Sequence, residues 1–199
     1  MRYYKRFVLA AALVAAALTM TVTALQQEQA ALAEKLIRLH VVANSDSEMD
    51  QQLKLQVRDA VLGKAEQVVQ HAEDPAAALQ AALPLLKETA ETCLRQCGST
   101  QAAEVSLKYE RFPTRAYETF SLPAGVYPSL RIVLGEGKGH NWWCVVFPSV
   151  CLRAVSQVEA AAVSAGFSEG EIHMITHPEE YVFKFKILEL LQQLQNWLT

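Results

Sequence analysis

The sequence is short of glycine, proline and surplus positive charge, and each shortage excludes a class of protein. Only 8 glycines and 7 prolines occur in 199 residues, which excludes a collagen-like or low-complexity chain. The 18 basic residues are outnumbered by 21 acidic ones and form no basic stripe. We therefore expect no electrostatically driven binding to nucleic acid. With 51% apolar residues, the chain can bury a hydrophobic core.

The N-terminus has the pattern of an export signal. Three positive charges, from Arg2, Lys5 and Arg6, precede nineteen residues, 7–25, that carry no charged side chain. Twelve consecutive apolar residues, 7–18, form the densest part of this run. That length is typical of the apolar core of a signal peptide. We expect the rest of the chain to lie outside the membrane.

Two outcomes are open for this segment. Val22 and Ala24 fit the small-x-small rule for a cut after Ala24. A helix over all nineteen residues would measure about 28 Å, close to a bilayer core, so an uncleaved anchor is also possible. We expect residues 1–25 to be a signal peptide or membrane anchor, and residues 26–199 to be a single exported globular domain. From residue 7 onward, 15 basic and 21 acidic residues give a formal charge of −6, so we expect membrane contact only through the N-terminal segment.

Four cysteines fall in two close pairs, Cys93 with Cys97 and Cys144 with Cys151. Export makes disulfides chemically permissible, and three pairings are possible. A strand that ends at Pro148 and turns back would bring Cys144 and Cys151 together, and we favour that bridge. Cys93 and Cys97 stand four apart on a predicted helix, where their side chains are too far apart for a bridge unless the last turn unwinds. Buried free thiols are an equally good interpretation of that pair.

Hydrophobic periodicity predicts an α+β domain. Residues 36–42 alternate between two faces and predict a strand. Capping residues at 44–48, including a Ser45/Glu48 capping box, then begin a helix over about 47–70. A second helical stretch starts at Asp74-Pro75 and runs to Cys97, with a kink or break at Pro84.

The middle of the sequence changes to a period of two. Strands are predicted around 105–112, 116–122, 130–134 and 141–147, the last placed in the middle of the sheet because both of its faces are apolar. We expect an antiparallel sheet of about four strands packed by helices. The tail, 178–198, returns to helix with one apolar stripe, and it should cap the core or bind a partner.

Several possible catalytic signatures have simpler interpretations. The segment Gly135-x-Gly-x-Gly139 lacks the spacing of a phosphate loop, and a strand follows it where a helix is required, so we interpret it as a hairpin turn. His173 and His177 lack the accompanying glutamate of a zinc protease motif, and we assign no metal or cofactor site. An alternative function is an exported cell-envelope hydrolase that uses His40, Asp46 and Cys144.

Three segments resemble the stage II sporulation protein R family. They are LIRLHVVANSD at 36–46, LKLQVRDAV at 53–61, and YPSLRIVLGEGKGHNWWCVVFP at 127–148 with Cys151 after it. The block GEGKGHNWWC is long and unusual in composition. The tail FKFKILEL at 183–190 and the leading segment also fit the family.

The resemblance implies a signalling protein of endospore formation. Members of the family are made in the forespore and exported into the space between the forespore and mother-cell membranes. There they trigger a membrane aspartic protease that cleaves pro-sigma-E. The resemblance implies no catalytic residues, because the family acts by binding and switching that protease.

Polar residues around two predicted loops are the candidates for partner binding. We expect them to lie at one end of the sheet, as a polar surface. They are His40, Asn44, Asp46, Glu136, Lys138, His140 and Asn141. An equally weighted interpretation is that Asn44 and Asp46 are helix caps, the tryptophans belong to the core, and the glycines only form a turn.

Overall fold

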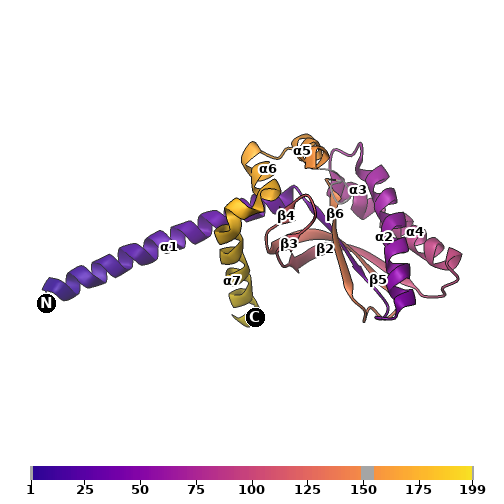
Figure 1. Ribbon diagram of the computed structural model, residues 1–199, viewed down its shortest axis with the longest axis horizontal. Helices are drawn as coiled ribbons and strands as arrows, with labels where there is room; N and C mark the ends of the chain where they lie inside the picture. The colour runs from indigo at the N-terminus through magenta and orange to yellow at the C-terminus, as the bar shows by residue number, and fades with distance from the viewer. Residues whose placement is uncertain (1, 149–154, 199) are drawn as a thin grey trace.

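The computed structural model describes residues 2–148 and 155–198. Helix α1 (Arg2–Glu34) begins the chain, and most of its length projects away from the body (Figure 1). Among the described helices, α1 is the one that is long and apolar enough to cross a membrane, and its apolar part is almost wholly exposed. Toward its C-terminal end α1 enters the body, where Leu25, Leu32 and Ala33 are buried. The N-terminal segment therefore has the form of a signal or membrane anchor.

A four-stranded sheet lies at the centre of the body, in the order β2, β5, β1, β6. The prediction of an α+β fold with about four strands packed by helices is confirmed. The pairs β2/β5 and β1/β6 are antiparallel, whereas β1 and β5 are parallel. A parallel pair needs a long crossover connection, and here the segment between β1 and β5 supplies it. The strands are β1 (Ile37–Val42), β2 (Ala103–Phe112), β5 (Gly125–Leu134) and β6 (Asn141–Phe147).

The position predicted for residues 141–147 in the sheet is wrong. β6 is an edge strand of the described sheet, and β5 and β1 occupy the middle. β6 is apolar on both faces because other elements cover each face. Trp142 lies under Arg58 of α2, whereas Val145 packs into the core on the opposite side. Burial on two faces does not by itself place a strand at the centre of a sheet.

Three helices cover one face of the sheet: α2 (Glu48–Val69), α3 (Pro75–Ala81) and α4 (Leu83–Gln96). The predicted helices are confirmed, and Asp74 caps α3 as expected. Ser47, rather than Ser45, caps α2 by accepting a hydrogen bond from the Asp50 amide. The break in the second helical stretch falls at Ala82, two residues before Pro84, because the proline occupies the first turn of α4.

The opposite face packs against the end of α1 and the C-terminal helices. Phe112, Tyr127 and Val145 form the centre of this second core. The strand predicted at 116–122 is instead two short strands that pair across a turn, and the helices between β6 and the tail were not predicted. The remaining elements are β3 (Arg115–Ala116), β4 (Ser121–Leu122), α5 (Val155–Ser164), α6 (Glu169–Thr176), the 3₁₀ helix Pro178–Tyr181 and α7 (Val182–Leu198).

Candidate partner-binding surface

The loop after β1 and the glycine segment between β5 and β6 lie at one edge of the sheet. β1 and β5 are parallel, so their carboxyl ends share this edge, and β6 starts from it. Because β1 lies between β5 and β6, the segment 135–140 crosses over the end of β1. The hairpin predicted here is therefore wrong: the glycines form a bridge between two strands that do not pair.

Asn44 fastens this bridge to the loop after β1. Its side-chain oxygen accepts a hydrogen bond from the Glu136 amide at 2.9 Å, and its backbone oxygen accepts one from the Lys138 amide at 3.1 Å. The Gly139 amide donates to the backbone oxygen of Ala43 at 2.9 Å. Three hydrogen bonds between the two segments make them one structural unit.

The glycines are explained by this close approach. Gly135 has a positive φ of 55°, and a Cβ there would overlap the Asn44 side chain. A Cβ on Gly139 would overlap the backbone carbonyl of Ser45. The carbonyl is part of the backbone and cannot rotate away as a side chain would. Glycine at these two positions therefore allows the bridge to lie directly against the loop after β1.

Asp46 and His140 join the two segments at the surface. The Asp46 carboxylate accepts hydrogen bonds from both the ring Nδ1 and the backbone amide of His140. These two hydrogen bonds lower the pKa of Asp46. Lys54 of α2 supports the same turn by donating to the His140 backbone oxygen at 3.0 Å. The side chains of Asp46 and His140 remain 55% and 78% exposed, so a partner can reach both.

Glu136 and Lys138 are the most prominent charges on the bridge. Their side chains are 69% and 75% exposed and form an ion pair at 2.7 Å. An ion pair this exposed contributes little to stability. Each of these side chains can leave this ion pair and form one with a charged group of a partner, at little cost in free energy. This property suits a docking surface more than a structural role.

Asp50 lies in the first turn of α2, buried against the loop, and it was not among the predicted site residues. Its carboxylate accepts hydrogen bonds from Asn44 at 2.8 Å, Ser45 at 2.5 Å and Gln101 at 2.6 Å. These bonds, led by the one from Ser45, lower its pKa to about 2. The sequence feature that could have identified Asp50 is its position three residues after the capping Ser47. Asp50 holds the side chain of Asn44, which in turn holds the bridge.

His40 lies inside β1 and is buried, so it does not reach the surface with the other candidates. Its ring stacks on Trp143, with centroids 3.9 Å apart. Its Nε2 lies 2.9 Å from the side-chain oxygen of Asn141, an exposed candidate. His40 therefore connects to the surface through Asn141, and its part in binding stays a prediction.

A partly buried charge network surrounds His40, and its members were not among the predicted site residues. Glu110 of β2 lies 3.2 Å from His40 Nδ1 and accepts a hydrogen bond from Arg131 of β5 at 2.7 Å. Burial raises the pKa of Glu110, but the Ser129 hydroxyl, Arg131 and His40 outweigh burial and leave the pKa below its usual value. The network ties three strands together below the bridge. The sequence feature that could have identified Glu110 is the alternation of side chains between the two faces of β2.

Arg38 is a buried cation on the same face of β1 as His40. It is fully buried, and its guanidinium stacks 4.3 Å from the centroid of Phe112. It donates hydrogen bonds to the backbone oxygen of Cys144 at 3.2 Å and to the Tyr117 hydroxyl at 2.9 Å. These contacts place Arg38 in the aromatic core, where it fastens the β3–β4 turn to the sheet.

The three residues of the hydrolase alternative do not form a catalytic group. Cys144 pairs in register with Leu39 and packs with it in the core on the α2 side of the sheet. His40 follows Leu39 directly and therefore points to the opposite face. Asp46 contacts His140 and lies in the loop beyond the strand. The sheet separates the Cys144 sulfur from the His40 imidazole.

The cysteine predictions have different outcomes. Cys93 and Cys97 are free thiols at the end of α4, but the expectation that they are buried is wrong, because Cys93 is half-buried and Cys97 is exposed. Cys144 is buried in β6. Cys151 lies outside the described residues, so the bridge between Cys144 and Cys151 stays a prediction.

The structure brings most of the predicted surface together. Asn44 and Asp46 from one segment contact Glu136 and His140 from the other. Lys138 lies in the same bridge, and Asn141 follows directly after it.

Among residues 2–148 and 155–198, no group of three or more His, Cys, Asp or Glu side chains could hold a metal ion.

Two comparisons with known proteins identify the same family. The family model described as stage II sporulation protein R matches residues 33–157, which include the whole loop and bridge. The chain is 36% identical over 160 residues to the stage II sporulation protein R of Bacillus subtilis (strain 168), covering 79% of this chain and 71% of that protein. No solved structure matches significantly. On the extent of both matches, the chain belongs to the stage II sporulation protein R family.

Proposed function

We propose that this chain is an exported signal of endospore formation that activates a membrane aspartic protease by binding it. The protease then cleaves pro-sigma-E in the mother cell. Membership of the stage II sporulation protein R family supports a role in sporulation. The exposed apolar helix α1 supports export across the forespore membrane, with the domain either released or held by its N-terminus.

The observation that carries the binding proposal is the interlocked surface of the β1–α2 loop and the glycine bridge. Asn44 and Asp46 accept hydrogen bonds from backbone amides of the bridge and hold it in place, while Glu136, Lys138 and His140 stay exposed on it. A rigid surface with exposed groups of both charges loses little conformational entropy when it binds. It is therefore suited to specific docking.

Activation by binding requires a difference in affinity. The signal must bind the active form of the protease more tightly than the inactive form, since only that difference shifts the equilibrium. No bond in the protease or in this chain needs to be made or broken. The separation of His40, Asp46 and Cys144 in the structure supports this non-enzymatic mode.

Co-expression in a non-sporulating host tests the proposal. The full chain, the protease and pro-sigma-E are produced together, and cleaved pro-sigma-E is measured by immunoblot. We expect cleavage well above that of the protease alone. Cleavage no greater than with the protease alone would contradict the proposal.

A charge-reversal variant tests the surface. Lys138→Glu combined with His140→Glu should lower cleavage about tenfold, which corresponds to about 1.4 kcal/mol of binding free energy. Lys87→Glu on α4 is the matched control, because Lys87 is exposed and lies on another element. Equal cleavage by the double variant and the control would exclude the bridge as the docking surface.

A further inference from the structure

Helix α7 has an exposed apolar stripe along its whole length. Its members are Phe183, Ile187, Leu190, Leu194 and Trp197, with exposed fractions of 86%, 36%, 58%, 48% and 82%. Spacings of four and three residues place all five on one side of the helix. Phe185 and Leu188 on the other side are buried against the body. The helix thus has two apolar sides, and the body covers only one.

The start of α7 lies beside α1, at the place where α1 leaves the body. Lys184 of α7 forms an ion pair with Glu28 of α1 at 2.8 Å. Leu25, one helical turn before Glu28, is the first apolar side chain to be buried among those described in α1, whereas Met20 is 75% exposed. The exposed apolar part of α1 therefore begins immediately beyond its contact with α7.

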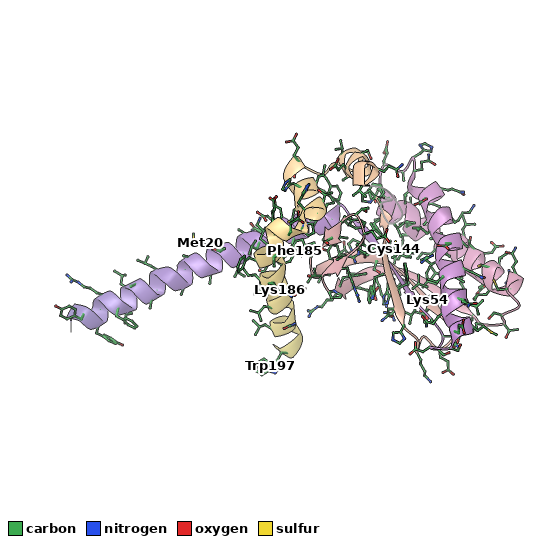
Figure 2. The ribbon with its side chains drawn as sticks, in the orientation of Figure 1. Met20, Lys54, Cys144, Phe185, Lys186 and Trp197 are labelled. Atoms are coloured by element: carbon green, nitrogen blue, oxygen red, sulfur yellow. The ribbon has the colours of Figure 1, made fainter. Side chains whose placement is uncertain are left out.

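The two helices run across each other. In Figure 1, α1 extends away from the body on one side of α7, and the sheet and its helices lie on the other. Since Phe185 and Leu188 face the body, the stripe faces the side toward which α1 extends. Figure 2 shows Met20 on the projecting part of α1 and Trp197 at the free end of α7. If α1 crosses a bilayer, α7 lies along the bilayer surface.

We propose that α7 is an interfacial helix that lies on a lipid bilayer, with its stripe inserted at the boundary between headgroups and acyl chains. Aromatic residues, Phe183 and Trp197, stand near the two ends of the stripe, as is common at membrane interfaces. Lys186, whose side chain is exposed beside the stripe and pairs with Glu189, can reach anionic headgroups. The contact extends the expected membrane attachment beyond the N-terminal segment, and it does not depend on the proposed protease partner.

Fluorescence quenching in proteoliposomes tests this contact. The full chain is reconstituted into phosphatidylcholine and phosphatidylglycerol vesicles whose acyl chains carry bromine near the headgroup. We expect the bromine to quench tryptophan emission, and Trp197→Phe to remove most of that quenching. Trp142 and Trp143 provide the background, because both pack within the sheet region.

A second variant tests the stripe itself. Leu190→Gln combined with Leu194→Gln should reduce the quenching of Trp197 severalfold, whereas Leu85→Gln, an exposed leucine on α4, should leave it unchanged. Far-UV circular dichroism checks that α7 remains helical in each variant.

Three results would overturn the proposal. The first is equal quenching of the wild type and Trp197→Phe. The second is quenching that survives the double leucine substitution with helical content intact. The third is self-association in detergent that the leucine substitutions abolish, which would make a second copy of the chain the occupant of the stripe.

Discussion

Replacing Asp50 with asparagine should destabilise the loop that carries the candidate surface. The buried carboxylate accepts three side-chain hydrogen bonds, from Asn44, Ser45 and Gln101. Asparagine keeps one acceptor oxygen and turns the other into a donor that faces donors. A hydrogen bond to a charged group is worth about 1.5 to 3 kcal/mol. Allowing for local relaxation, we expect Asp50→Asn to lower the free energy of unfolding by roughly 2 to 3 kcal/mol.

The effect of this substitution should depend on pH. The folded-state pKa of Asp50 is about 2, below the ordinary value of 3.8. A depressed pKa stabilises the fold above the unfolded-state pKa, and that contribution is lost as the pH falls toward the folded-state pKa. The difference between wild type and variant should therefore be full above about pH 5 and shrink between about pH 4 and pH 2.

Denaturant unfolding of the full chain in detergent, followed by circular dichroism, measures both quantities. Asp59→Asn on the same helix is the control, because its side chain is 57% exposed and pairs only with the neighbouring Arg58 among the described ion pairs. The control should change stability by less than about 0.5 kcal/mol. An Asp50 variant as stable as the control, or a difference that does not vary with pH, would refute this reasoning.

Further predictions concern the bridge, the charge network around His40 and the cysteines. Gly139→Ala should lower the free energy of unfolding by about 1 to 3 kcal/mol, because the new Cβ would overlap the backbone of Ser45. The control Gly63→Ala, which has open space within α2, should raise the free energy of unfolding by up to about 1 kcal/mol. Thermal unfolding that reversed this order would contradict the close approach of Gly139 to the loop after β1. Glu110→Gln should lower the free energy of unfolding by about 1 to 3 kcal/mol at neutral pH, and by progressively less as the pH falls through the lowered pKa of Glu110. A loss of stability that does not vary with pH in acid titrations would count against the network. Peptide mapping without reductant should recover Cys144 linked to Cys151, and alkylation of both in the native exported protein would disprove that bridge.

Local features of the fold were predictable because they depend on neighbours in sequence. Asp74-Pro75 and Gly98 mark helix ends through their own side chains and backbone preferences. The strand order was not predictable in this way. Insertion of β1 between β5 and β6 depends on contacts far apart in the sequence, so the glycine bridge resembled a hairpin. Likewise, the apolar residues on both faces of β6 indicate that other elements cover both faces. They do not indicate the position of β6 in the sheet.

The candidate surface was predictable where its residues are exposed loop polar groups. Asn44, Asp46 and His140 follow or precede strands whose ends the alternation pattern locates. Buried Asp50 and half-buried Glu110 were not predicted, because both look like solvated helix and strand residues until the tertiary fold supplies their hydrogen-bond donors. His40 was misplaced for the same reason: a polar residue in a strand is buried here because Glu110 and Asn141 satisfy it.

Photocrosslinking from the glycine bridge tests the central claim most directly. A benzoylphenylalanine in place of Lys138, on the full chain produced together with the membrane protease, should give a crosslinked product that contains both proteins. The same label in place of Lys87 on α4 should give none. Crosslinking from position 87 and none from position 138 would contradict the claim that this chain acts by docking through the bridge.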